Sequence, residues 1–201
     1  MSLLILIRHG QSIYNLENRF TGILDIGLTD FGKEEAKLAG LKFKNLKFDY
    51  AYTSALKRAQ ESLKIILNIL HQKSIVIISN KAFNERNYGS LQGLNKEETI
   101  AEFGLKQVEI WRRSYDICPP DGESLKDTFN RVVPYFKSQV EPKLLENKNI
   151  LIVAHGNSLR ALVMYLEHID KKEVAALNIS TCVPRQYNFD KNLTILEKKY
   201  L

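Results

Sequence analysis

Leu3-Leu4-Ile5-Leu6-Ile7-Arg8-His9-Gly10 decides the fold of this chain, because an uninterrupted apolar run ends abruptly in two basic residues and a glycine. A short run of branched apolar residues without polar alternation is typical of a strand that is covered on both faces of a parallel sheet. The glycine permits a tight turn directly after such a strand. The sequence therefore predicts a central strand with a basic side chain and a histidine at its carboxyl end.

A second stretch near the other end of the sequence repeats this arrangement. Ile150 to Ala154 is again a continuous apolar run, and His155-Gly156-Asn157 follows it directly. In open parallel sheets the ligand crevice lies beyond the carboxyl ends of the strands. We therefore expect His9 and His155 to meet in one crevice, whereas His71 and His168 lie at helix ends and are interpreted as structural.

The remaining pattern alternates strands with helices. Strands are predicted over 48–53 and 75–78, with a final hairpin over 184–200 that turns at 190–192. Helices are predicted from an N-cap at Thr29, from a cap at Ser54, across 121–147 with kinks at Pro134 and Pro142, from Ser158, and near 171–177. This order predicts an α/β fold, a three-layer sandwich with a mostly parallel central sheet.

Residues 84–123 differ from the rest of the chain, because they are polar, contain Gly89, Gly93 and Gly104, and show only short helical patterns. A segment of this kind typically crosses the surface of a domain and forms a lid or pocket wall. We predict a single domain over 1–201 with this excursion at about 84–123.

Composition excludes several classes of protein. The net charge of +6 arises from scattered Lys and Arg residues rather than a basic arm, so no nucleic-acid partner is expected. No apolar stretch approaches the roughly 20 residues of a membrane span, and no secretory leader is recognisable, which favours a cytoplasmic protein. Neither the two cysteines nor the histidines have metal-ligand spacing, so no metal site is predicted.

Two arginines complement the paired histidines. Arg8 precedes His9, and Arg58 falls in the first turn of the helix expected after the 48–53 strand. A guanidinium group stays charged and matches two phosphate oxygens at once. Histidine is a suitable covalent nucleophile for phosphoryl transfer, because its neutral form is available near neutral pH. The constellation predicts an enzyme that acts on a phosphorylated small molecule.

The motif Leu6-Ile7-Arg8-His9-Gly10-Gln11-Ser12 resembles the signature of the histidine phosphatase superfamily. Further matches run in order along essentially the whole chain and resemble its cofactor-dependent phosphoglycerate mutase family. They include Arg19-Phe20-Thr21-Gly22, Asn84-Glu85-Arg86, Trp111-Arg112-Arg113 and Ala154-His155-Gly156-Asn157-Ser158-Leu159-Arg160. The resemblance implies a phosphoglycerate mutase-like fold.

The same resemblance implies catalytic roles for five residues. His9 would become phosphorylated, while Arg8, Arg58 and His155 would stabilise the transferring phosphoryl group. Glu85 would act as general acid and base on the substrate hydroxyl, a task that favours a carboxyl with a raised pKa. The implied substrate contacts are Arg8, Asn15, Thr21, Gly22, Arg58, Glu85, Tyr88, Lys96, Arg112, Arg113, Gly156 and Asn157.

The implied reaction is the glycolytic and gluconeogenic interconversion of 2-phosphoglycerate and 3-phosphoglycerate, primed by 2,3-bisphosphoglycerate without a metal. Lys96, Arg112 and Arg113 favour this reaction over simple monoester hydrolysis, because a substrate with both carboxylate and phosphate needs cations at two ends of its pocket. A phosphatase of the same fold, a metal hydrolase and a non-catalytic phosphate-binding scaffold are the alternatives. A homodimer is the expected assembly.

Overall fold

The computed structural model describes residues 1–201 and contains one six-stranded sheet in the order β3-β2-β4-β1-β5-β6. β1 (Ser2–Arg8), β2 (Tyr50–Thr53), β3 (Val76–Ser79) and β4 (Ile150–Ala154) run parallel, and β5 (Arg185–Phe189) and β6 (Ile195–Tyr200) form an antiparallel hairpin at one edge. The prediction of a mostly parallel sheet is confirmed.

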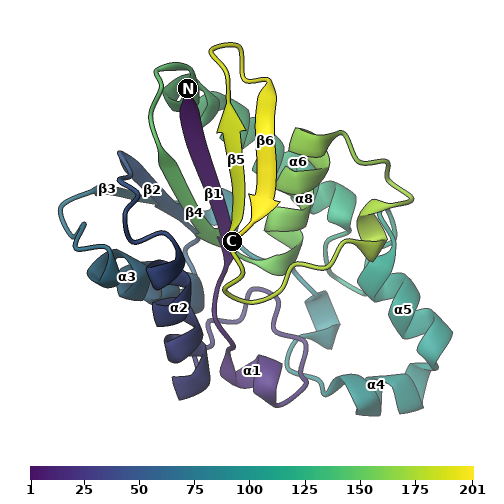
Figure 1. Ribbon diagram of the computed structural model, residues 1–201. Helices are drawn as coiled ribbons and strands as arrows, with labels where there is room; N and C mark the ends of the chain where they lie inside the picture. The colour runs from purple at the N-terminus through teal and green to yellow at the C-terminus, as the bar shows by residue number, and fades with distance from the viewer.

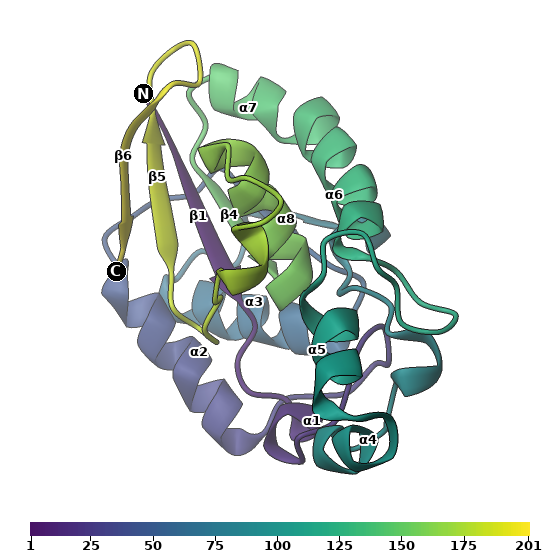
Figure 2. The same cartoon turned by 90° about the vertical axis from the view of Figure 1, so that its right-hand side faces the viewer.

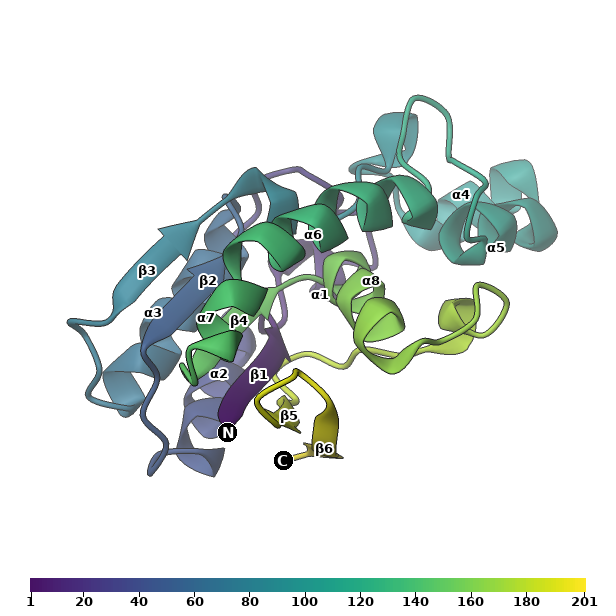
Figure 3. The same ribbon diagram turned by 90° about the horizontal axis from the view of Figure 1, so that it is seen from above.

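Helices cover both faces of this sheet, as Figures 1 and 3 show. α2 (Asp30–Lys42) and α3 (Lys57–Ile69) pack on one face with Leu3, Ile5 and Ile7 of β1. α6 (Leu125–Gln139), α7 (Glu141–Leu145) and α8 (Gly156–Glu167) pack on the other face with Leu4 and Leu6. Because alternate residues of a strand point to opposite faces, the unbroken apolar run of β1 serves both cores.

The remaining elements lie beyond the carboxyl ends of the parallel strands. α1 (Ile13–Leu16), α4 (Lys96–Phe103) and α5 (Leu105–Arg113) gather there in two views at right angles (Figures 1 and 2). Short 3-10 turns lie at Lys81–Phe83, Gly89–Leu91 and Val174–Ala176. Segments 9–29, 84–123 and 170–182 therefore approach one another beyond the carboxyl ends of the parallel strands. No helix combines the length and apolarity needed to cross a membrane.

Two glycines allow the loop after β1 to lie in direct contact with the start of α2. A side chain on Gly10 would clash with the carbonyl group of Gly32 in α2, and one on Gly32 would clash with the backbone of Gln11. Thr29 caps α2 by accepting a hydrogen bond from the Gly32 N–H, as predicted. The loop after His9 is thus held directly against the start of α2.

Two helix predictions were wrong in detail. Pro134 lies inside an unbroken α6, because Val132, Val133 and Phe136 bury that helix against the sheet. The break expected near Pro142 is present, because α6 and α7 are separated at Val140. The predicted helix over 171–177 is only a single 3-10 turn.

Candidate active site

His9 and His155 lie side by side. β1 and β4 are adjacent parallel strands with Arg8 opposite Ala154, so the residues that follow them are neighbours. The two imidazole centroids are 5.0 Å apart, and the rings are tilted by 59°. The pairing expected from the two strand ends is therefore present, although these residues stand near opposite ends of the sequence.

The hydrogen bonds of His9 define its tautomer. Its Nδ1 lies 2.6 Å from the Gly10 carbonyl oxygen, which can only accept, so Nδ1 carries the proton. The other ring nitrogen, Nε2, therefore bears a lone pair and accepts a hydrogen bond from Arg58 Nε at 3.3 Å. Burial, followed by the charges of Arg58 and Arg8, holds the pKa of His9 well below its ordinary value. His9 is a neutral imidazole with its nucleophilic nitrogen beside a guanidinium group.

His155 is completely buried and is bound by Ser54. Its Nε2 lies 2.7 Å from Ser54 Oγ, while its Nδ1 has no hydrogen-bond partner. The prediction that Ser54 caps a helix was wrong, because α3 begins at Lys57 after an N-cap residue, Leu56, that makes no side-chain bond. Ser54 instead accepts from the Leu56 N–H and orients the imidazole. Burial and then the charge of Arg58 lower the pKa of His155 well below its usual value, so it too is neutral.

Arg58 and Arg8 approach the histidines from two elements. Arg58 is fully buried in the first turn of α3, and its terminal nitrogens donate to the Gly22 and Leu24 carbonyls at 2.7 and 2.8 Å. Burial lowers its pKa to about 10, which still leaves it charged at neutral pH. Arg8 donates to the Ile179 carbonyl at 2.9 Å, and its buried Nε has no partner. Both guanidinium groups can hold an anion delivered to His9.

Glu85 is an acidic residue of the site and is 8% exposed. Its Oε1 accepts from the backbone N–H groups of Arg86 at 2.8 Å and Asn157 at 3.0 Å. Burial pushes its pKa upward, but those two donors together with the charges of Arg8 and Arg58 outweigh burial, and the net pKa is lowered. The raised pKa expected for an acid–base group is absent here, and Glu85 is an ionised proton acceptor.

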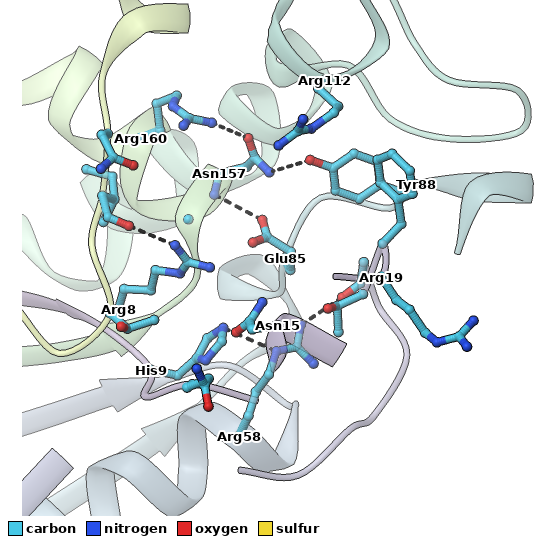
Figure 4. Close-up of a pocket in the computed structure, with 18 of the residues that line it drawn as sticks. Arg8, His9, Asn15, Arg19, Arg58, Glu85, Tyr88, Arg112, Asn157 and Arg160 are labelled. Carbon is cyan, nitrogen blue, oxygen red and sulfur yellow. Dashed lines mark hydrogen bonds between the residues drawn. The ribbon is translucent and has the colours of Figure 1, made fainter. Parts of the chain in front are cut away.

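These groups surround a cavity of about 500 Å³, part of which is drawn in Figure 4. Every residue predicted for catalysis or substrate contact lines it except His155, whose ring lies next to that of His9. Tyr88, Lys96, Arg112 and Arg113 come from the 84–123 segment. Cationic side chains dominate the lining: Arg8, Arg19, Arg58, Lys96, Arg112, Arg113 and Arg160, against the carboxylates of Glu35 and Glu85.

The N-terminal loop contributes Asn15, Thr21 and Gly22 to the same cavity. Asn15 is held by a reciprocal pair of hydrogen bonds with Ser12 at the start of α1. Gly22 has a φ of 53°, and its carbonyl group is the acceptor for Arg58. The loop is therefore fixed to the arginine that contacts His9.

Sequence reasoning missed several parts of the cavity, among them Arg19, Glu35, Arg160 and the segment 174–181. Segment 174–181 lines it with Asn178, Ile179 and Thr181, and its backbone carbonyls accept from three arginines: Ala175 from Arg113, Leu177 from Arg160 and Ile179 from Arg8. Thr181 donates to Glu35 at 2.6 Å, and Glu35 also accepts from the Gln11 N–H. A carbonyl group has no sequence signature, so only coordinates reveal this wall.

No group of three or more His, Cys, Asp or Glu side chains is arranged to hold a metal ion. Arg8 and Arg58 lie beside the histidines, and their positive charges would repel a metal cation at that position. The side chains that can offset negative charge here are organic cations.

Known proteins are similar to this chain over nearly its whole length. Residues 4–199 match the family model described as the histidine phosphatase superfamily (branch 1). A protein of Parvibaculum lavamentivorans named 2,3-bisphosphoglycerate-dependent phosphoglycerate mutase is 53% identical over all of this chain and 96% of its own length. A protein of the same name from Bartonella henselae is 51% identical over 97% of this chain and 96% of its own.

Solved structures share the fold at lower identity. YhfR of Bacillus stearothermophilus has a TM-score of 0.85 at 23% identity, covering 97% of this chain and 94% of its own. A mycobacterial glucosyl-3-phosphoglycerate phosphatase in complex with VO3 has a TM-score of 0.84 at 23% identity, covering 98% and 96%. The paired strand-end histidines, the arginine-lined cavity and the match over residues 4–199 lead to one conclusion: this chain belongs to branch 1 of the histidine phosphatase superfamily.

Proposed function

We propose that this chain is a 2,3-bisphosphoglycerate-dependent phosphoglycerate mutase, which interconverts 2-phosphoglycerate and 3-phosphoglycerate through phosphorylated His9. The observation that carries the proposal is the neutral His9, whose Nε2 lone pair lies in a cavity where seven cationic side chains outnumber two carboxylates. The mutase name of relatives about half identical over their full length supports it.

The charge of the cavity suits a polyanion. A phosphomonoester carries about −1.5 to −2 at neutral pH, so a carboxylate with two phosphates carries roughly −4 to −5. Seven cationic side chains against two carboxylates leave a positive excess of similar size. 2,3-Bisphosphoglycerate therefore fits, and it supplies the phosphoryl group that primes His9.

His9, Arg8, Arg58 and His155 form the phosphoryl-transfer half of the site. In the donating step, the bond from His9 Nε2 to phosphorus breaks as the substrate hydroxyl oxygen bonds to phosphorus. Arg8 and Arg58 offset the charge on the phosphoryl oxygens, and the unpartnered Nδ1 of His155 is free to join them. The bisphosphoglycerate formed in this step then presents its other phosphoryl group, whose bond to the substrate oxygen breaks as a bond from phosphorus to His9 Nε2 forms.

Glu85 accepts the hydroxyl proton in the donating step and returns it in the reverse step. Its ionised state in the free site suits the first role. After the first transfer the proton resides on Glu85, and in the second transfer Glu85 delivers it to the substrate oxygen that is released from phosphorus.

The substrate contacts proposed are Asn15, Thr21, Gly22, Tyr88, Lys96, Arg112, Arg113, Gly156 and Asn157, with Arg8, Arg58 and Glu85 shared with catalysis. They span the cavity from the N-terminal loop to the 84–123 segment. Lys96, Arg112 and Arg113 bind the anionic group remote from His9. We treat residues 84–123 as the substrate-selecting wall of a single domain over 1–201.

A coupled assay of 3-phosphoglycerate turnover, with and without 2,3-bisphosphoglycerate, tests the proposal. Wild type should show mutase activity stimulated by the bisphosphate, and His9→Ala should show neither turnover nor labelling from radioactive bisphosphate. His71→Asn is the matched control, because asparagine tolerates the positive φ of 55° at that exposed site. Release of inorganic phosphate without mutase activity would indicate the phosphatase alternative instead.

We also propose that the protein is a homodimer in the cytoplasm. β3 is one of the two edge strands of the sheet, and its Val76 and Ile77 are 54% and 50% exposed. An exposed apolar edge is suited to association with a second copy. Light scattering of wild type and Ile77→Lys measures this: a dimer that the substitution dissociates supports it, and a monomeric wild type refutes it.

A further inference from the structure

Arg160 is a buried cation of the cavity to which the proposed mechanism gives no role. It lies one turn after Asn157 in α8 and is 8% exposed. Its Nη1 donates to Asn157 Oδ1 at 2.6 Å, and its Nε and Nη2 both donate to the Leu177 carbonyl, at 3.0 and 2.9 Å. The guanidinium group thus donates to two neighbours, the Asn157 side chain in the cavity wall and the Leu177 carbonyl.

The bond to Asn157 fixes which end of its amide faces the cavity. A guanidinium group contains only donors, so the Asn157 atom beside it must be the carbonyl oxygen. The amide nitrogen therefore points the other way, where it lies 3.5 Å from the Tyr88 hydroxyl, as Figure 4 shows. Asn157 presents hydrogen-bond donors to the cavity and no acceptor.

Asn157 also contacts the proposed proton acceptor. Its backbone N–H donates to Glu85 Oε1 at 3.0 Å, so one residue lies between Arg160 and Glu85. The Asn157 amide N–H groups can donate to an anionic oxygen of the ligand. If the side-chain carbonyl faced the cavity instead, it would repel that oxygen.

We propose that Arg160 is a positioning residue that holds the Asn157 amide with its donor facing the cavity, and so makes this wall select an anionic oxygen of the phosphoglycerate. The inference rests on the proposed function. Arg160 itself acts through Asn157 and does not contact the substrate. The hydrogen bond from Asn157 is made equally in the substrate complex and in the transition state. Its loss should therefore raise KM more than it lowers kcat.

Asn157→Asp is the sharpest test, because it retains an oxygen for Arg160 and replaces the cavity-facing donor with a negatively charged acceptor. We expect KM for 3-phosphoglycerate to rise about tenfold to a hundredfold, the range for losing a hydrogen bond to a charged group, with a smaller change in kcat. An unchanged KM would overturn the proposal, because the orientation would then not matter to the ligand.

A double-mutant cycle separates positioning from a general structural role. Arg160→Met should raise KM about tenfold in wild type, and by no more than about twofold when Asn157 is already alanine. An equal rise in both backgrounds would show that Arg160 acts through Leu177 or overall stability, and would refute the inference. Arg160→Lys should recover part of the loss, since one donor can still reach Asn157.

Failure of the proposed function is distinguishable from failure of this inference. A wild type without mutase activity refutes the function. Calorimetric titration of wild type and Asn157→Asp with 3-phosphoglycerate then still measures whether the amide selects an anion. An active wild type whose Asn157→Asp variant binds equally well refutes the inference alone.

Discussion

Arg58 donates its Nε–H to His9 Nε2, so the proposed nucleophilic nitrogen is engaged by a fixed cation before any ligand enters. The contact is 3.3 Å long, whereas the other Arg58 nitrogens make bonds of 2.7 and 2.8 Å to carbonyl groups. The guanidinium group is therefore anchored by its short bonds and can exchange the long one for a phosphoryl oxygen. It also keeps the imidazole neutral.

This relationship predicts a change in pH dependence on replacing Arg58 with methionine. Burial is the main cause of the lowered pKa of His9, and Arg58 is the next. Removing its charge should raise the pKa of His9 toward its usual value, so the acidic limb of phosphoenzyme formation should move to higher pH. The rate at the optimum should fall about a hundredfold or more. An unmoved acidic limb would contradict the electrostatic role.

Arg58→Lys is the matched control for charge. It keeps a cation near His9 but cannot donate to Gly22, Leu24 and His9 together. We expect its acidic limb to stay near that of wild type while its rate falls. Rapid-quench measurement of phosphorylated protein across pH separates the two effects.

Glu85→Gln should separate proton transfer from phosphoryl transfer. The substituted amide would retain an oxygen for the Arg86 and Asn157 N–H groups but could not accept a proton. Mutase kcat should fall about a hundredfold to ten-thousandfold. Labelling of His9 by p-nitrophenyl phosphate should fall much less, because its leaving group needs no proton. Equal losses with both donors would exclude the acid–base role.

Protein stability should decline as pH falls below about 6.5. His9 and His155 have pKa values well below 6.5 in the folded protein, so the unfolded chain binds more protons in this range. The contribution of these two histidines to the free energy of unfolding is therefore fully present above pH 6.5. It is lost as the pH falls toward their pKa values in the folded protein. Each such histidine contributes up to about 1.4 kcal/mol per pH unit. Urea denaturation between pH 5.5 and 7.5 measures this slope, which should be shallower in His155→Gln.

Lys96→Ala should weaken binding of doubly anionic substrates selectively. Lys96 lies at the start of α4, on the 84–123 segment, and donates to Asn18 at 3.3 Å. We expect KM for 3-phosphoglycerate to rise about tenfold, as for a lost charged hydrogen bond, with KM for p-nitrophenyl phosphate nearly unchanged. A similar rise for both substrates would place Lys96 at the transferred phosphate instead.

The strand ends explain how much of this site could be predicted. His9 and His155 follow the two most uniformly apolar runs in the sequence, and parallel strands bring their carboxyl ends together whatever the intervening chain does. Arg58 was predictable for the same reason. These inferences depend on local pattern and on general topology, and both are visible in a single sequence.

The remaining features depend on contacts that no local pattern encodes. Ser54 looks like a helix cap, but its hydroxyl group is bound to the buried His155, which is far away in the sequence and follows the neighbouring strand β4. The 171–177 segment looks helical, but the Ala175 and Leu177 carbonyls accept bonds from arginines of the cavity. The lowered pKa of Glu85 likewise depends on cations contributed by other elements.

The division of labour between the sheet and the 84–123 segment bears on how such enzymes diversify. The histidines belong to the rigid frame, whereas Tyr88, Lys96, Arg112 and Arg113 are carried on one uninterrupted piece of chain. A recombination event that exchanged that piece while retaining Glu85 near its start could give a descendant a new preferred metabolite with the same phosphorylation chemistry. Innovation in this architecture would then proceed by transplanting a block rather than by accumulating scattered point changes.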